Sequence, residues 1–171
     1  MSISTEGIEL DALAVFSHPD DAELTVAGTL LKLKRQGYRT GVVDVTRGEM
    51  GTRGTLEGRT EEARAAARIL GLDVRLNLGQ PDGHVHVTEE SRRAMVRVIR
   101  THRPKVIFTA HWDDPHPDHA AAGRAAAEAA PVTGSISRSA ALVAPSNDCQ
   151  PRRRMTPRVA SAPSRSGPAA M

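Results

Sequence analysis

The segment Leu10–Asp21, LDALAVFSHPDD, decides the fold, because a short apolar run passes directly into a turn of histidine, proline and two aspartates. The apolar part, Leu10–Ser17, has the length and composition of a buried strand. The residues that follow, Asp21–Gly37, carry apolar side chains at helical spacing and end at a glycine. We therefore expect a strand followed at once by a helix, with the polar turn at the carboxyl end of the strand.

Strand-like and helix-like segments alternate along the chain to about residue 130. Further strands are expected at Thr40–Thr46, Val74–Leu78 and Lys105–Ala110. Further helices are expected at Arg59–Leu70, from a T-E-E-S capping box at Thr88 to about His102, and at Ala120–Ala129. Such alternation predicts an α/β fold, a Rossmann-like three-layer α/β/α sandwich around a mostly parallel sheet. In the common order 3-2-1-4, strands one and four are neighbours at the crevice where ligands bind.

A second polar cluster, DDPHPDH at 113–119, follows the fourth expected strand. In the order 3-2-1-4 this cluster and the HPDD of residues 18–21 follow neighbouring strands, so the fold brings them together. Either cluster alone is also explained by an Asx turn or a helix N-cap. Their occurrence after two adjacent strands favours one shared site.

The residues of the two clusters have the composition of a catalytic metal site. His18 and Asp21 form a pair three residues apart, and His119 is the best distant third ligand. Two imidazoles and one carboxylate, with a fourth position left for water, suit Zn²⁺, with Fe²⁺ as the alternative.

Three further residues of the clusters have chemistry that a hydrolytic site needs. Asp20 stands between two expected ligands, where a general base for the attacking water belongs. His116, as an imidazolium, would stabilise an oxyanion or protonate a leaving amine. Asp118 would fix the tautomer of a histidine through a hydrogen bond, without binding the metal itself.

The loop Thr46–Thr55, TRGEMGTRGT, lacks the GxGxxG order and follows the second strand, so a dinucleotide site is not expected. Arg47, Glu49 and Arg53 near the mouth of the crevice would hold a polar or anionic substrate. A solvated loop without a binding role is the alternative, and the sequence leaves both open.

Composition and charge exclude several classes of protein. The chain has 171 residues and a single cysteine, Cys149, so neither an internal disulfide nor a CxxC metal site exists. No apolar run approaches the roughly 20 residues of a membrane span, and the N-terminus lacks an export pattern, so we expect a cytoplasmic protein without membrane contact. The basic pI of about 9.6 comes from residues 129–171, with six Arg against one Asp, so nucleic-acid binding is not expected.

Residues 131–171 differ in composition from the rest of the chain. They are rich in Pro, Ser, Arg and Ala, with one short strand expected at Ala140–Ala144. We expect a domain at 1–130 and an atypical tail at 131–171 that is disordered or is not the native continuation of the domain.

Four segments resemble the LmbE/PIG-L family of zinc-dependent N-acetylglucosaminide deacetylases. They are HPDD at 18–21, VDVTRGEMGTRGT at 43–55, LNLGQPDG at 76–83 and RPKVIF…HPDH at 103–119. The resemblance runs from about Leu10 to Glu128. Within it, the loop sequence and the RPKVIF segment are most similar to the bacillithiol-biosynthesis branch, which deacetylates N-acetylglucosaminyl malate.

The resemblance implies a zinc hydrolase that removes acetyl from a small N-acetylated amino-sugar conjugate, and a homo-oligomer is compatible with it. It implies that His18, Asp21 and His119 bind zinc and that Asp20 is the general base. It also implies that His116 stabilises the tetrahedral intermediate and that Arg53 and Asp82 lie near the sugar or aglycone pocket.

The chain also departs from the family in two places. Thr25 and Ala27 stand where the family has a glycine-rich helix start, and residues 131–171 do not look like the strands and helices with which the family continues. A C-terminally truncated or altered, catalytically impaired member with a disordered or interaction tail is therefore the alternative reading.

Overall fold

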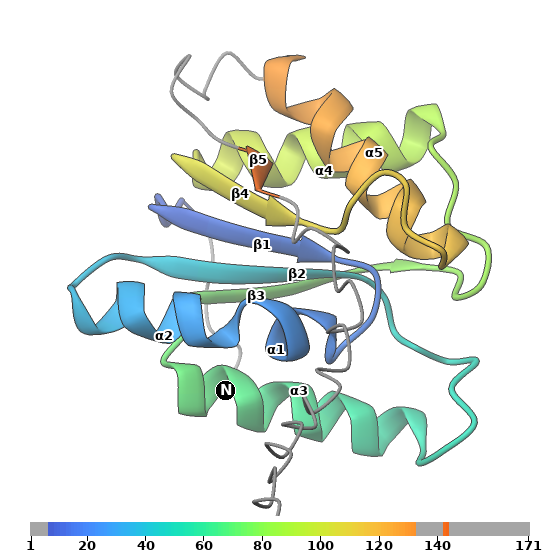
Figure 1. Cartoon of the computed structure of the whole chain (residues 1–171), viewed down its shortest axis with the longest axis horizontal. Coiled ribbons are helices and arrows are strands. Elements are labelled where there is room, and N and C mark those ends of the chain that lie inside the picture. The colour runs from blue at the N-terminus through green and yellow to red at the C-terminus, as the bar shows by residue number, and fades with distance from the viewer. Residues whose placement is uncertain (1–6, 133–141, 144–171) are drawn as a thin grey trace, which may run out of the picture.

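The computed structural model describes residues 7–132 and the two-residue strand Leu142–Val143 (Figure 1). The expected properties of the tail at 131–171 fall almost wholly outside these residues and stay predictions. The short strand expected at Ala140–Ala144 is present as β5, Leu142–Val143.

The sheet confirms the predicted fold class and the predicted order of the first four strands. Its strands are β1 (Ala12–Phe16), β2 (Thr40–Thr46), β3 (Val74–Gln80), β4 (Val106–Thr109) and β5. They lie in the order β3-β2-β1-β4-β5, and every neighbouring pair is parallel. The carboxyl ends of β1 and β4, which lead into the two polar clusters, are therefore adjacent.

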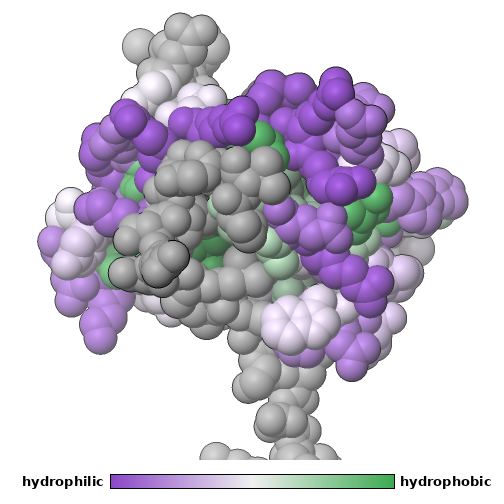
Figure 2. All heavy atoms as spheres, turned by 90° about the horizontal axis from the view of Figure 1, so that it is seen from above, coloured by the Kyte–Doolittle hydropathy of each residue, from purple (hydrophilic) through white to green (hydrophobic). Residues whose placement is uncertain are grey.

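Helices cover both faces of the sheet (Figure 1). On one face lie α1 (Asp21–Thr25), α2 (Ala27–Arg35) and α3 (Leu56–Leu70). On the other lie α4 (Glu89–His102) and α5 (Pro117–Val132). Seen from the side of α4 and α5, the described surface is mostly hydrophilic, with small apolar areas between polar side chains (Figure 2).

The central strand β1 is buried along its whole length and supplies side chains to both faces. Leu13 and Val15 belong to the larger apolar cluster, which also contains residues of α4 and α5. Ala14 and Phe16 belong to the smaller cluster with Leu30 of α2. This alternation is the period of two that a strand imposes on its side chains. No helix in the described part of the chain combines the length and apolar character needed to cross a bilayer.

Three helices differ from the predicted ones: the first is divided, α3 begins earlier, and α5 runs over Pro117–Val132 instead of Ala120–Ala129. The helix expected over Asp21–Gly37 is divided at Val26, and the Thr25 hydroxyl donates to the Asp21 carbonyl 2.6 Å away. Such bonds to the carbonyl four residues earlier bend helices. Helix α3 starts three residues earlier than expected because the Thr55 hydroxyl accepts from the Gly58 N–H and caps it.

The start of α5 is fixed closely against the sheet. A Cβ placed on Gly123 would lie 2.4 Å from the Ala110 carbonyl oxygen, just beyond β4, so only glycine permits this approach. Ala122 and Ala126 are fully buried beside it. Because the HPDH residues open this helix, the close packing sets their position relative to β1.

Candidate metal centre

The two polar clusters meet at the carboxyl ends of β1 and β4, as the sequence predicted. The imidazole centroids of His18 and His119 are 5.4 Å apart although the residues are a hundred positions apart in the chain. One donor atom from each of His18, Asp21 and His119 lies within 4.8 Å of the other two. The strand order is the cause, since β1 and β4 are paired.

The spacing of the donor atoms fits a tetrahedral metal ion. His18 Nδ1 lies 3.3 Å from Asp21 Oδ2, and His119 Nε2 lies 3.4 Å from the same oxygen. A tetrahedral ion with ligand bonds of about 2.0–2.1 Å separates its ligand atoms by about 3.3–3.4 Å. The three side chains are only partly buried, at 12–25% exposure.

A second combination, His18, His116 and Asp118, also has donor atoms within 4.8 Å, but it is the weaker site. Asp118 is 1% exposed, and its two carboxylate oxygens accept hydrogen bonds from the backbone N–H groups of Gly83 and Val85. Both oxygens of Asp118 are thus engaged, whereas Asp21 accepts a backbone N–H, that of His18 at 2.9 Å, on Oδ2 alone. Asp118 therefore ties the loop after β3 to helix α5.

The far side of the His18 ring faces two carboxylates. Nε2 lies 2.9 Å from Asp82 Oδ1 and 3.4 Å from Asp118 Oδ2. A proton on Nε2, shared with these oxygens, leaves the lone pair of Nδ1 directed at the metal position. The predicted contact of Asp118 is thus present at the longer distance, and Asp82 makes a shorter one.

The contact between Asp82 and His18 was not foreseen from the sequence, which assigned Asp82 to the substrate pocket. The available signal was the PDG turn after the third strand, at the same edge of the sheet as both clusters. Asp82 also accepts from the Met50 N–H at 2.9 Å, and its own N–H donates to Glu49 Oε1 at 2.9 Å. Glu49 therefore braces two loops against each other.

The charges around His18 favour its protonated form when no metal is bound. Burial lowers the pKa of His18, but the hydrogen bond and charge of Asp21, with further contributions from Asp82 and Asp118, outweigh burial and raise the pKa to about 9. A metal ion entering the site must displace this proton, since a ligating imidazole is unprotonated.

Asp20 occupies a strained turn and does not cap the helix that follows it. Its φ is 141°, a region that favours glycine, and its side chain makes no capping hydrogen bond to α1. The helix-cap explanation of this aspartate therefore fails. Burial raises the pKa of Asp20, the charge of Asp21 raises it further, and Arg59 opposes both.

A small cavity of about 250 Å³ adjoins Asp20. Its lining residues come from the turn after β1, the loop after β2 and the start of α3: Pro19, Asp20, Arg53, Gly54, Gly58, Arg59 and Glu62. The structure thus brings Arg53, an expected substrate residue, to the same cavity as the expected base.

His116 lies beside both histidine ligand candidates. Its ring stacks on that of His119 with centroids 4.5 Å apart and meets the His18 ring edge-on at 5.1 Å. The Asp118 N–H donates to His116 Nδ1 at 3.2 Å, which requires an unprotonated Nδ1 and places the ring proton on Nε2. In this conformation His116 is a neutral donor, and the expected imidazolium would have to give up that bond.

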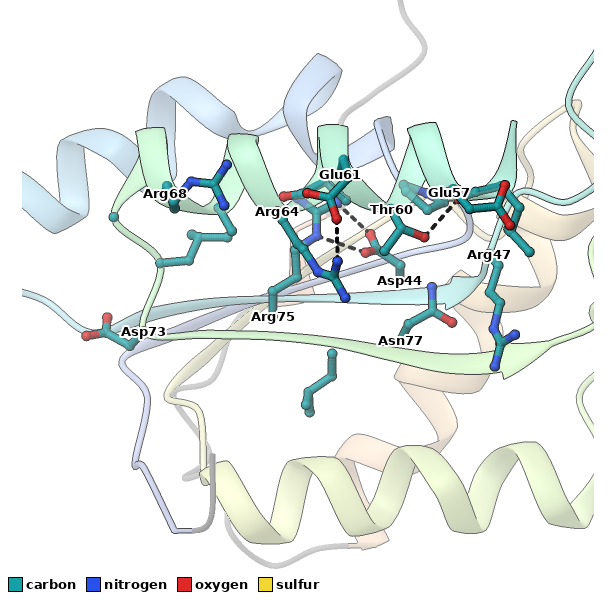
Figure 3. Close-up of a pocket in the computed structure, with 17 residues that line it drawn as sticks. Asp44, Arg47, Glu57, Thr60, Glu61, Arg64, Arg68, Asp73, Arg75 and Asn77 are labelled. Carbon is teal, nitrogen blue, oxygen red and sulfur yellow. Dashed lines mark hydrogen bonds and ion pairs between the residues drawn. The ribbon is translucent and has the colours of Figure 1, made fainter. Parts of the chain in front are cut away.

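A cavity of about 1280 Å³ lies elsewhere, between α3 and strands β2 and β3 (Figure 3). Arg75 and Asp44 line it, and with the partly buried Glu23 they form an ion cluster, here called the Arg75 cluster. The guanidinium donates to both oxygens of Asp44 at 2.9 and 3.1 Å, to the Ala63 carbonyl at 3.1 Å, and to Glu23. None of the candidate metal ligands lines this cavity.

Two curated relatives cover part of the chain. Diacetylchitobiose deacetylase of Thermococcus kodakarensis is 34% identical over 135 residues, which is 71% of this chain and 49% of that protein. A probable N-acetyl-alpha-D-glucosaminyl L-malate deacetylase 2 of Bacillus anthracis is 34% identical over 135 residues, which is 71% of this chain and 59% of that protein. The chain thus spans between half and three fifths of the length of these relatives.

Solved structures share the fold. The conserved protein TT1542 of Thermus thermophilus is 47% identical with a TM-score of 0.70, over 80% of this chain and 61% of that one. GalB, the 4-carboxy-2-hydroxymuconate hydratase of Pseudomonas putida, is 27% identical with a TM-score of 0.64, over 71% of this chain and 55% of that one. The same fold therefore carries more than one reaction.

The family model described as PIG-L, GlcNAc-PI de-N-acetylase, matches residues 13–130. This range includes nearly all of β1, the whole of β2 to β4 and both polar clusters. The convergent histidines and aspartates, the parallel sheet that carries them and this match lead to one assignment: the chain belongs to the PIG-L family.

Proposed function

We propose that the protein is a metal-dependent hydrolase that removes the acetyl group from a small N-acetylated amino-sugar conjugate. The observation that carries the proposal is the spacing of His18 Nδ1, Asp21 Oδ2 and His119 Nε2, which fits one tetrahedral ion beside the strained Asp20. Membership of a deacetylase family supports the reaction type. Zinc is the proposed ion and Fe²⁺ the alternative, because both accept two imidazoles and a carboxylate.

His18, Asp21 and His119 would hold the ion. When bound, the metal supplies Lewis-acid polarisation of the amide carbonyl and lowers the pKa of a water molecule. Asp20 accepts a proton from the attacking water and passes it to the departing nitrogen. The new carbon–oxygen bond gives acetate and the broken carbon–nitrogen bond gives the free amine. The raised pKa of Asp20 suits a group that both accepts and returns a proton.

His116 and the cavity beside Asp20 have complementary roles in this proposal. The Nε2–H of His116 donates to the oxygen on which negative charge develops. Arg53 and Arg59 line the cavity together with Asp20 and Glu62, and their guanidinium groups are the donors that an anionic substituent would contact. An N-acetylglucosaminyl malate, whose aglycone carries carboxylates, is therefore the preferred substrate, and the Bacillus anthracis relative supports this choice.

The test is acetate release with bound zinc measured on three substrates: N-acetylglucosamine, its malate glycoside and its inositol glycoside. Asp20→Asn is expected to keep its zinc and lose about 10²- to 10⁴-fold in turnover. Asp113→Asn, at an exposed neighbouring position, is the matched control and is expected to keep full turnover. Undiminished acetate release by Asp20→Asn would remove Asp20 from its role.

A catalytically impaired family member is the second candidate. The observation that favours it is the Pro-, Ser- and Arg-rich composition of residues 131–171, which differs from that of the preceding domain. This candidate predicts zinc binding without acetate release on any of the three substrates. Zinc content and acetate release measured on the same preparation distinguish the two proposals.

A further inference from the structure

Asp114, in the loop between β4 and α5, contacts two histidines of the site through one oxygen. Its Oδ1 lies 3.2 Å from His119 Nδ1 and accepts the backbone N–H of His116 at 2.9 Å. The Asp114 side chain is 18% exposed, so water competes only weakly for this oxygen. The contact connects the candidate ligand and the candidate oxyanion donor to the same carboxylate.

The two nitrogens of the His119 ring face different partners. Its Nε2 faces Asp21 and the metal position, so Nδ1 is the remote nitrogen. A carboxylate on the remote nitrogen holds the proton there, fixes the rotation of the ring and makes the ligating nitrogen more basic. Asp82 already stands in this relation to His18. With Asp114, each histidine ligand candidate has its own carboxylate on the nitrogen that faces away from the metal.

The same Asp114 oxygen also fixes the backbone position of His116. By accepting the His116 N–H, Asp114 closes an Asx turn across Pro115, whose ring limits the backbone further. The His116 ring then stacks on the His119 ring at 4.5 Å. A shift of Asp114 would therefore move both rings together.

We propose that Asp114 is a positioning residue, which sets the tautomer and orientation of His119 for metal binding and the placement of His116 beside it. The proposal rests on the proposed function only for its effect on turnover, because its effect on metal affinity is measured without substrate.

The neighbouring Asp113 provides a matched control. It is exposed, and among the described residues its only hydrogen bond is the one that its backbone N–H donates to His111 Nδ1. Asp113→Asn therefore removes the same charge one residue away without touching either site histidine.

The test compares zinc affinity, measured by competition with a chelator, in the full-length wild type, Asp114→Asn, Asp114→Ser and Asp113→Asn. The serine variant keeps an acceptor for the His116 N–H but is too short to reach the His119 ring, so it serves if the asparagine variant folds poorly. Both Asp114 variants are expected to bind zinc about 10- to 100-fold more weakly, and Asp113→Asn within about twofold of wild type. An exchange-protected Nδ1–H proton of His119 in the NMR spectrum of the zinc-bound wild type is expected to disappear in Asp114→Ser and to exchange faster in Asp114→Asn, whose amide oxygen is a weaker acceptor than a carboxylate.

Zinc affinity within about twofold of wild type in a folded Asp114 variant, or an equal loss in Asp113→Asn, would overturn the proposal. If the wild type binds zinc and releases no acetate while the Asp114 variants still lose affinity, the proposed function fails and the positioning role stands.

Discussion

The protein holds two clusters of carboxylates, and they differ in what neutralises them. In the Arg75 cluster, Asp44 and Glu23 surround a guanidinium that is always charged. Around His18 lie Asp21, Asp82 and Asp118, and within residues 7–132 no Lys or Arg forms an ion pair with any of the three. The negative charge of the first cluster is balanced by a permanent cation, the Arg75 guanidinium. The negative charge of the second can instead be balanced by an exchangeable cation, which is a proton on His18 or a metal ion.

The two clusters are neighbours on one short helix. Asp21 opens α1, and Glu23 follows two residues later and points to Arg75. Two carboxylates two residues apart in one helix thus have different partners. A permanent counter-charge marks a carboxylate that stabilises the fold, whereas an exchangeable one marks a carboxylate that is available for binding.

The largest effect is expected from removing the permanent cation. Burial raises the pKa of Asp44 to about 6 even beside Arg75, so Arg75→Met leaves this 2% exposed carboxyl either charged and unpaired or protonated, and the free energy of unfolding should fall by about 3–5 kcal/mol in urea denaturation. Lys34→Met is the control, because the Lys34–Asp73 pair is partly exposed and should cost about 1 kcal/mol or less. Equal costs for the two variants would contradict a structural role for the Arg75 cluster.

Adding the exchangeable cation to the other cluster should stabilise the protein nearly as much. Free zinc at about a hundred times its dissociation constant is expected to raise the free energy of unfolding by about 2.7 kcal/mol. At the same zinc concentration, His119→Ala should gain little, while His86→Ala, an exposed histidine away from the cluster, should gain the full amount. A full gain in His119→Ala would show that the ion binds elsewhere.

The proton should act as a weaker substitute for the metal. Because the pKa of His18 is raised from 6.5 to about 9 in the folded protein, its contribution to stability is complete below pH 6.5 and is lost as the pH rises through 9. Metal-free protein should therefore lose about 1 kcal/mol or more of unfolding free energy between about pH 6 and pH 9. His18→Gln, which cannot take up the proton, should lack this decline, and an unchanged decline in the variant would assign it to other groups.

The smallest effect concerns the strained turn at Asp20, which adjoins His18 and Asp21 and has no counterpart among the described residues of the Arg75 cluster. Because Asp20 has a φ of 141°, Asp20→Gly should be about 1 kcal/mol more stable than Asp20→Ala, the reverse of the usual order of these two residues. Both variants lose the carboxylate, so both should lose turnover equally. Greater stability of the alanine variant would mean that the turn stores no strain.

The sequence predicted the frame of the site because its signals are local. The apolar runs before His18 and before the HPDH cluster, together with the expected strand order, were enough to bring His18, Asp21 and His119 together. The division of the first helix at Val26 was not predicted, since it accompanies a single side-chain hydrogen bond from Thr25.

Contacts between distant loops were beyond the sequence patterns. Asp82 reaches His18 because the loop after β3 is held by Asp118, which lies 33 and 35 residues beyond its two hydrogen-bond donors. Arg75 stands in a segment that the patterns identify only as a strand, and its acidic partners are 31 and 52 residues away. Pairings of this kind depend on the finished packing of the chain.

The bonds from Gly83 and Val85 to Asp118 have a consequence for synthesis on the ribosome. Until residue 118 has emerged and its helix has docked, these two amides lack their acceptor. The loop that places Asp82 beside His18 is then without the two hydrogen bonds that hold it in position. The rim of the sheet is thus completed after strands β1 to β4 have been synthesised, so a nascent chain can pair these four strands before its two polar clusters are held together.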